Sequence, residues 1–396
     1  MDLPFIPLGN NNQKGNDMSI KDTLSGRRTR REILKGASVL GGGVLALPYL
    51  SRLAFAEPVE LTMLAWYGHA EPDMVAEFEA ENNVKFKPKY YTGGDNMLGL
   101  ISQSPPGTFD IILSDAEYVQ QLNAAGYIEK LDPADYPFDD FFPEFQKFPG
   151  HWVGDELYSV ITRFGFLGVA YNTEAITEKE ASTYNVYWDE KLKGKVGHFD
   201  WHLPNLGQMS LLNGNASPYD IDEAAWEAVQ EKTKTLRPQI GGFFDYGGTF
   251  SSLQNGQMLA MAGIGDWITG TLERNGAKVR SVIPEEGGLQ FTESFSIGKG
   301  SKKADLAKKW IQYITSPKGQ VKSANMVAYP CLIPNQKGWE LLAKETPEEA
   351  KRQGMLLNES NNAMELIRSG RIKYRQLPVQ QSLEDWNDFW SEYKGS

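Results

Sequence analysis

Beyond its N-terminal region, the sequence alternates short apolar runs with segments of helical periodicity, and this alternation constrains the fold most. Residues 59–66 and 84–91 have the length and composition of buried strands, while residues 72–82 and 116–126 have the spacing of amphipathic helices. Strands that alternate with helices are typical of α/β layers around a largely parallel sheet. The sequence therefore predicts an α/β fold.

A second set of alternating segments follows, and a long strand-like run at residues 157–172 separates it from the first. This run is long enough to pass from one sheet into another, so we expect a domain boundary near Gly165. Residues 132–156 are rich in Pro, Asp and Phe and are interpreted as a long surface excursion. Strands are expected at 195–200, 259–264, 278–283 and 292–297, and helices at 222–236, 266–275, 304–315, from Pro317 and at 382–394.

The first 56 residues have the parts of a secretory signal. A basic segment precedes a Gly-broken apolar core, and Ala54-Phe55-Ala56 forms a small-x-small cleavage site. Residues 29–35, TRREILK, resemble the twin-arginine export motif. An uncleaved membrane anchor is the alternative, but the core is shorter than the roughly 20 apolar residues that a span needs. We expect cleavage after Ala56 and, because no lipid-attachment cysteine follows, a soluble periplasmic protein.

The charge balance is acidic and excludes one class of partner. The net charge is −11 for the whole chain, and removal of the expected signal, with its 8 Lys/Arg and 4 Asp/Glu, would leave a net charge of −15. Nucleic-acid binding needs a basic footprint, so no nucleic-acid partner is expected. A cationic ligand is compatible with this charge. Cys331 is the single cysteine, so no intramolecular disulfide can form.

Motifs of catalysis and of cofactor binding are missing from the sequence. There are four histidines and no GxSxG, HExxH or P-loop pattern. His198 and His202 have a metal-like spacing that needs a helix, whereas the segment is interpreted as a strand entering a loop. Gly263 and Gly265 resemble a nucleotide-binding turn, but Asp266 directly after them would repel phosphate. We therefore expect a protein that is not an enzyme, with no catalytic residue, metal or cofactor.

Several predicted strands end in acidic or aromatic residues. Asp115, Asp200 and Asp266 each follow a strand, Glu117 comes one turn after the first of them, and Trp66 ends the first strand. Ligand crevices of α/β proteins lie at the carboxyl ends of strands. For Asp266 a helix N-cap role alone is an equal alternative. A crevice of carboxylates and aromatic rings suits an organic cation, because both attract an ammonium group.

Five further segments carry a resemblance to a known family. They are FDIILSDAEYV at 109–119, GVAYN at 168–172, KLKGKVG at 191–197, VIPEEGGLQFTESFSI at 282–297 and AYP at 328–330. With them, residues 57–396 resemble the periplasmic substrate-binding proteins of ABC transporters, in their spermidine/putrescine-binding branch. The resemblance implies a type II periplasmic-binding-protein fold, with a cleft between two lobes joined by crossing hinge strands. The implied lobes are 57–165 with 293–330, and 166–292 with 331–396.

The resemblance also implies ligand contacts. Trp66, Phe291 and Tyr329 would pack on the aliphatic chain of a polyamine, while Glu293 and Asp266 would bind its amines. Hinge closure would trap the ligand, and a membrane permease would receive it from a monomeric binding protein. The remaining residues expected at the site are Tyr67, His69, Asp115, Glu117, Asp200, Trp201 and Trp267.

Departures from the family pattern keep other ligands open. His69 stands where Tyr is usual, and Trp201 replaces an acid of the spermidine-type site. If Arg163, Lys373 or Arg375 points into the cleft, a zwitterionic solute becomes an alternative to a polyamine. A twin-arginine-exported enzyme and a ferric-ion binder that uses residues 89–91 are further alternatives, although a strand would place those tyrosines on alternating faces.

Overall fold

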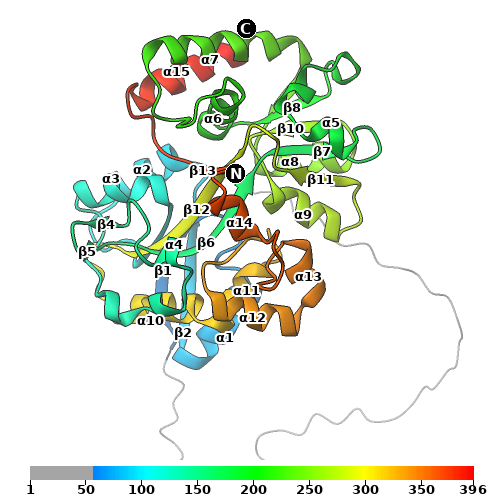
Figure 1. Cartoon of the computed structure of the whole chain (residues 1–396). Helices are drawn as coiled ribbons and strands as arrows, with labels where there is room; N and C mark the ends of the chain where they lie inside the picture. The colour runs from blue at the N-terminus through cyan, green and yellow to red at the C-terminus, as the bar shows by residue number, and fades with distance from the viewer. Residues whose placement is uncertain (1–56) are drawn as a thin grey trace, which may run out of the picture. The chain divides into compact units, whose positions relative to one another are not determined.

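Two large β-sheets, together with the small pair β4-β5, organise residues 57–396, the part of the chain that this computed structural model describes (Figure 1). The expected signal peptide, residues 1–56, lies outside the described residues. Helices flank both sheets, so the α/β architecture with two sheets expected from the alternating pattern is confirmed.

The first sheet has the strand order β13-β12-β3-β1-β2, with β6 pairing β12 on its other side. Strand β1 runs parallel to β2 and β3, while β12 runs antiparallel to β3 and β6. Its strands are β1 (Val59–Ala65), β2 (Val84–Tyr90), β3 (Ile111–Asp115), β6 (Val160–Leu167), β12 (Gly288–Ile297) and β13 (Ile372–Tyr374). The helices in this half of Figure 1 are α1 (Pro72–Asn82), α2 (Gly94–Ser102), α3 (Val119–Ala124), α10 (Ala304–Thr315), α11 (Pro317–Ala324), α12 (Gln336–Glu345), α13 (Pro347–Arg352) and α14 (Ala363–Arg368).

The second sheet has the order β11-β7-β10-β8-β9 and lies above the first in Figure 1. Strand β8 runs parallel to β9 and β10, and β7 runs antiparallel to β10 and β11. Its strands are β7 (Val169–Asn172), β8 (Val196–Phe199), β9 (Ile240–Phe244), β10 (Ala260–Ala262) and β11 (Val279–Val282). Its helices are α5 (Glu178–Ala181), α6 (His202–Leu212), α7 (Glu223–Leu236), α8 (Tyr246–Gln254), α9 (Asp266–Arg274) and α15 (Leu383–Gly395).

The chain passes between the sheets at three places. Gly168 joins β6 to β7, residues 283–287 join β11 to β12, and residues 375–382 join β13 to α15. A Cβ atom at Gly168 would come 2.2 Å from the Val282 carbonyl oxygen, so only glycine allows these connections to lie so close. The lobe boundaries expected from the sequence stay a prediction; sheet membership places all of β12 and β13 with the first sheet.

Residues 132–156 lie mostly at the surface, as expected, but several of their aromatic side chains enter the core. The segment folds into short elements, and the rings of Phe141 and Phe145 are completely buried. The Phe145 ring lies 4.6 Å from that of Phe164 on β6, because so much aromatic surface is more stable away from water. The elements are η4 (Pro133–Asp135), η5 (Phe138–Asp140), α4 (Pro143–Gln146), β4 (Trp152–Val153) and β5 (Glu156–Leu157).

The segment at His202 also differs from expectation, since α6 begins there and is not a loop. Even so, no group of three or more His, Cys, Asp or Glu residues able to hold a metal ion occurs within residues 57–396. His198 instead hydrogen-bonds Asn205 and the hydroxyl of Tyr393. In the described part of the chain, no helix has the length and apolar character to cross a membrane. The Cys331 thiol is free and buried.

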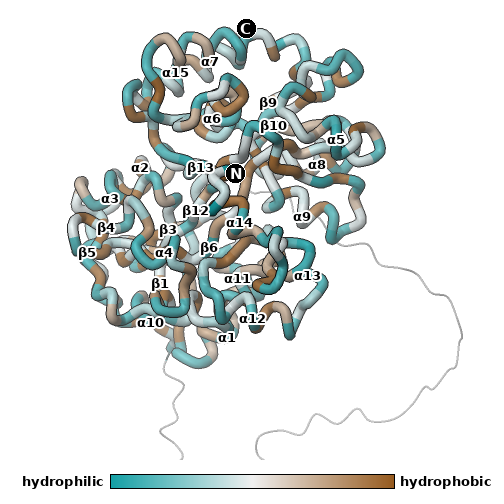
Figure 2. The backbone as a smooth tube through the Cα atoms, viewed as in Figure 1, coloured by the Kyte–Doolittle hydropathy of each residue, from teal (hydrophilic) through white to brown (hydrophobic). Residues whose placement is uncertain are grey.

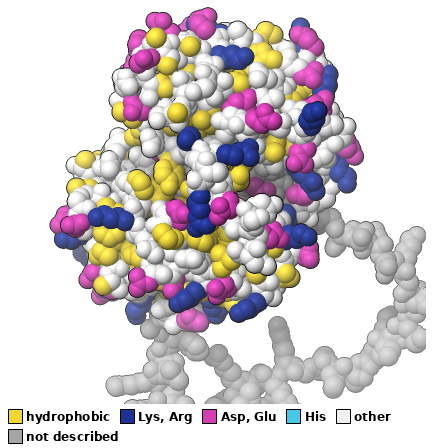
Figure 3. Space-filling model, in the orientation of Figure 1, with side chains coloured by type: hydrophobic (Ala, Val, Ile, Leu, Met, Phe, Trp, Pro, Cys, Tyr) yellow, Lys and Arg dark blue, Asp and Glu magenta, His cyan; other side chains and the backbone are white. Residues whose placement is uncertain are grey.

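The core around the first sheet is aromatic. Trp310 of α10 is fully buried and packs on Phe78 of α1 and Phe86 of β2, with ring centroids 5.3 and 4.8 Å away. Figure 2 shows the complementary pattern at the surface, where the peripheral helix α13 is mostly hydrophilic. Acidic and basic side chains are interspersed over the face seen in Figure 3.

We predict that Phe145→Ala lowers the free energy of unfolding by about 3–5 kcal/mol, the range for truncating a buried aromatic ring. Val153→Ala is the matched control in the same segment: its side chain is exposed, so we expect a change within about 0.5 kcal/mol. Urea unfolding followed by circular dichroism measures both. Equal effects of the two variants would contradict the burial of this segment.

Candidate functional site

The pairing of three strands places three charged residues in one row of the first sheet. Glu293 of β12 is the register partner of Asp115 on β3 and of Arg163 on β6. Side chains of directly opposite residues project from the same face of a sheet. All three residues are buried, so the row brings two carboxylates and a guanidinium together away from water.

The corner after β1 brings His69 to this row. Gly68 adopts φ +104°, a conformation that favours glycine, and a Cβ atom there would lie 2.7 Å from the Ala328 Cβ. The turn directs His69 inward, where its Nε2 lies 3.0 Å from Glu293 Oε2 and 3.0 Å from the Tyr329 hydroxyl. That hydroxyl donates to Glu293 Oε1 at 3.0 Å. His69 and Tyr329 therefore orient the carboxylate.

The charge of Glu293 is held by its neighbours. Burial pushes the pKa of Glu293 up, but the hydrogen bond with His69 and the charge of the Arg163 guanidinium oppose this effect and hold the pKa below its ordinary value. The Nε of Arg163 lies 3.3 Å from Glu293 Oε2, and its Nη2 donates to the Tyr329 carbonyl at 2.7 Å. Burial lowers the pKa of His69, so its ring is neutral near pH 7. Glu293 is consequently a charged, paired carboxylate.

Arg375, directly after β13, binds the other two acids of this region. Its Nη2 donates to Asp115 Oδ1 and its Nε to Glu117 Oε1, both at 2.6 Å. The guanidinium lies 4.3 Å from the ring centre of Trp201, and the Trp66 indole donates to Asp115 Oδ2 at 3.1 Å. Burial raises the pKa of Asp115, and the Arg375 guanidinium opposes the rise. The Arg375 guanidinium is thus enclosed by charge-assisted hydrogen bonds to two carboxylates and by the ring face of Trp201.

Aromatic rings from the two sheets meet beside these charges. Trp66, after β1, lies 6.0 Å from Trp201, which follows β8. Tyr67 lies 6.2 Å from Tyr246 at the start of α8, and the Tyr246 hydroxyl donates to the Ala328 carbonyl at 3.1 Å. We call these four rings, with Trp267, Phe291 and Tyr329, the aromatic seam.

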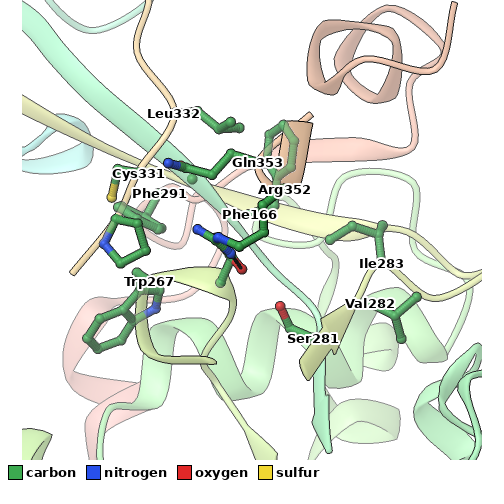
Figure 4. Close-up of a pocket in the computed structure, with 13 residues that line it drawn as sticks. Phe166, Trp267, Ser281, Val282, Ile283, Phe291, Cys331, Leu332, Arg352 and Gln353 are labelled. Carbon is green, nitrogen blue, oxygen red and sulfur yellow. Dashed lines mark hydrogen bonds and ion pairs between the residues drawn. The ribbon is translucent and has the colours of Figure 1, made fainter. Parts of the chain in front are cut away.

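The other end of the aromatic seam borders a cavity of about 170 Å³ (Figure 4). The ring of Trp267, on α9, lies 5.9 Å from Tyr329 and 6.4 Å from Phe291. At Gly165 a Cβ atom would lie 2.6 Å from the Phe291 ring, so this glycine makes room for it. The cavity is lined by Gly165, Phe166, Asp266, Trp267, Ser281, Val282, Ile283, Phe291, Pro330, Cys331, Leu332, Arg352 and Gln353.

Asp266 lies at this cavity with a basic partner. The N-cap of α9 is Gly265, so the alternative of an Asp266 N-cap is wrong, and Asp266 is the first residue of the helix. Its carboxylate accepts a hydrogen bond from Arg352 Nη1 at 2.7 Å, and its side chain remains 42% exposed. Figure 4 shows Arg352 extending from α13 towards the helix of Trp267.

Asp200 has different partners from the other expected site residues. Its carboxylate accepts hydrogen bonds from the Trp390 indole at 2.9 Å and from Lys394 Nζ at 2.8 Å, both on α15. Asp200 is therefore bound to the C-terminal helix α15, whereas the other expected residues lie in the aromatic seam or among the charged residues beside it.

Sequence reasoning missed Tyr246 and Arg352, and it left the position of Arg375 open. Tyr246 follows β9, whose two glycines hide its strand character, but the Asp245 N-cap directly before it was a usable signal. Arg375 follows β13, a strand of three residues that pairs with β12, far away in the sequence. No local pattern indicates such a pairing.

Comparisons with known proteins show the family of this chain and proteins with a similar fold. The family model described as bacterial extracellular solute-binding protein matches residues 73–373. The spermidine/putrescine-binding periplasmic protein of Salmonella typhimurium is 24% identical over 78% of this chain and 87% of its own length.

Two solved structures have a similar fold. A spermidine/putrescine ABC transporter protein of Listeria monocytogenes superposes with a TM-score of 0.72 at 22% identity, over 85% of this chain and 98% of its own. The spermidine/putrescine substrate-binding protein of Streptococcus pneumoniae gives a TM-score of 0.68 at 19% identity, over 85% of this chain and 99% of its own.

We predict that His69→Gln makes the stability of the protein less dependent on pH below about 6.5. Because the folded pKa of His69 lies below its unfolded value of about 6.5, the unfolded state binds more protons in this window and stability falls with the pH. Replacing His69 should reduce the slope of the free energy of unfolding against pH by up to about 1.4 kcal/mol per pH unit. Unfolding curves of both proteins between pH 4.5 and 7 measure it; parallel stability profiles would show that His69 is not buried neutral.

Proposed function

Because this chain belongs to the family of bacterial extracellular solute-binding proteins, we propose that it captures a small amine-bearing solute between its two sheets and delivers it to the permease of an ABC importer. The observation that carries this proposal is the meeting of carboxylates from the first sheet with aromatic rings from both sheets. Carboxylates accept charge-assisted hydrogen bonds from ammonium groups, and ring faces cover the attached methylenes. The proposed function makes and breaks no covalent bond.

Hinge closure is the proposed mechanism. Each sheet with its helices acts as a lobe, and the three connections at Gly168, 283–287 and 375–382 act as the hinge. A ligand that touches Trp66 in one lobe and Trp267 in the other favours the closed state by its differential affinity for that state. The permease then recognises the closed form.

We place this activity in the periplasm, with the signal cleaved after Ala56 and the protein working as a monomer. The twin-arginine-like segment at residues 29–35 supports export, and the Salmonella relative is named as a periplasmic protein. The acidic net charge supports the expectation that the protein has no nucleic-acid partner.

Polyamines are the first ligand class to test, because relatives that share 22–24% identity with this chain are named for spermidine and putrescine or for putrescine and cadaverine. A zwitterionic amine is the second candidate, and a specific observation favours it: Arg163 and Arg375 both lie among the acids beside the aromatic seam. A guanidinium in this place can bind a carboxylate of the solute.

Thermal-shift screening of the purified protein tests the proposal. Ligands that bind only the folded state stabilise it by mass action, by about 2.7 kcal/mol at a concentration of 100 times Kd. We expect a rise in Tm with putrescine, spermidine or 4-aminobutyrate, and none with maltose or ferric citrate. A rise with the sugar or with iron and with no amine would overturn the proposal.

Asp266→Asn and Glu293→Gln are predicted to weaken binding of the amine found in this screen by about 1.5–3 kcal/mol each, the range for hydrogen bonds to charged groups. This corresponds to roughly a 10–150-fold rise in Kd, measured by isothermal titration calorimetry. Asp155→Asn is the control, since that carboxylate is fully exposed on the β4–β5 turn and should leave Kd unchanged. Unchanged affinity in both site variants would remove these two residues from the binding site.

A further inference from the structure

The acids expected to bind the amines of a ligand already have basic partners within the chain. Arg375 binds Asp115 and Glu117, and Arg163 lies 3.3 Å from Glu293. At the cavity, Asp266 is paired with Arg352 in the same way, and Lys394 binds Asp200. Among residues 57–396, none of the five expected acids is therefore left without a cationic partner.

Arg375 makes the contacts that an ammonium group of a polyamine would make. It donates to two carboxylates at 2.6 Å and lies over the face of Trp201 at 4.3 Å. The side chains of Arg375, Asp115 and Glu117 are only 3%, 4% and 1% exposed. A ligand ammonium could replace the guanidinium only by leaving it buried and unpaired, which is strongly unfavourable.

The remaining charge at the site is small. The three carboxylates of Asp115, Glu117 and Glu293 face two guanidinium groups, those of Arg375 and Arg163, while the buried His69 is neutral. At most one unit of negative charge is left, because burial raises the pKa of Asp115 to about 7 and partial protonation of this carboxylate can only lower the count. Asp266 belongs to a separate network of two acids and two arginines at the other end of the aromatic seam, and this network is neutral overall as long as Asp266 is present. A single ammonium completes the balance, whereas a second one would bring an uncompensated charge into a buried site.

We propose that Arg375 occupies the place of one ammonium group of a polyamine, so that this protein selects aliphatic amines with a single ammonium over diamines and polyamines. The inference rests on the proposed amine-binding function and narrows its ligand. The other end of the ligand then carries a neutral amide, a carboxylate or a methyl group. It lies along the aromatic seam, where Trp66 and Trp267 cover its methylenes.

Titration of the wild-type protein with matched solutes tests this selection. Putrescine and N-acetylputrescine have the same carbon chain but two and one ammonium groups, and 4-aminobutyrate and butylamine extend the comparison to a carboxylate and a methyl end. We expect at least one single-ammonium solute to bind ten times more tightly than putrescine and spermidine. The tightest-binding of the three single-ammonium solutes then shows which group the preferred ligand carries at its other end: an acetamide, a carboxylate or a methyl group. Tightest binding of putrescine or spermidine would overturn the inference and leave the proposed function standing. Binding of none of these amines would overturn both.

Variants at position 375 test the role of the guanidinium itself. Arg375→Gln frees Asp115 and Glu117, so the affinity for putrescine should rise at least tenfold over that of the wild type. Arg375→Lys keeps a cation and should keep the preference for one ammonium. Arg280→Gln removes a guanidinium whose side chain is 60% exposed on β11, and it should leave the preference unchanged. A folded Arg375→Gln protein with wild-type affinity for putrescine would contradict the role of Arg375. The wild-type titration decides the question if this variant does not fold.

Discussion

The buried charge row of Arg163, Glu293 and Asp115 determines how the rest of the site is built. Strand register places the three side chains on one face, and burial makes each charge costly unless a partner is present. The surrounding residues meet this requirement: His69 and Tyr329 bind Glu293, and Arg375 binds Asp115. Each of these partners comes from a different segment of the chain, so the row ties the corner after β1, the segment after α11 and the segment after β13 to one place.

The aromatic seam depends on the same row. Arg375 pairs with Asp115 of the first sheet and lies over the ring of Trp201, which follows a strand of the second sheet. The same guanidinium therefore contacts both sheets. The link between Tyr246 and the Ala328 carbonyl and the pair of Asp266 with Arg352 join α8 and α9 to segments on the first sheet's side. We expect polar pairs of this kind to break and re-form if the two proposed lobes open and close.

The residues at the strand ends of the first sheet could be predicted from the sequence. The α/β alternation and the rule that crevices form at carboxyl ends placed Trp66 and Asp115 together, and the likeness around residues 291–293 added Glu293. The same rule could not show that α15, nearly two hundred residues later, supplies Trp390 and Lys394 to the carboxylate of Asp200. It could not place Arg375 either, since the three-residue strand β13 is defined only by its pairing with β12. In residues 132–156, Pro and Asp indicate a segment at the surface, but they do not show that its phenylalanines are buried.

A crystal structure of the protein with its tightest-binding amine would show whether Arg375 takes the place of a ligand ammonium group. We expect one ammonium group beside the charge row, methylenes between Trp66 and Trp267, and Arg375 still bound to Asp115 and Glu117. A ligand bound away from the aromatic seam, or a ligand ammonium that has displaced Arg375 from those carboxylates, would contradict this expectation.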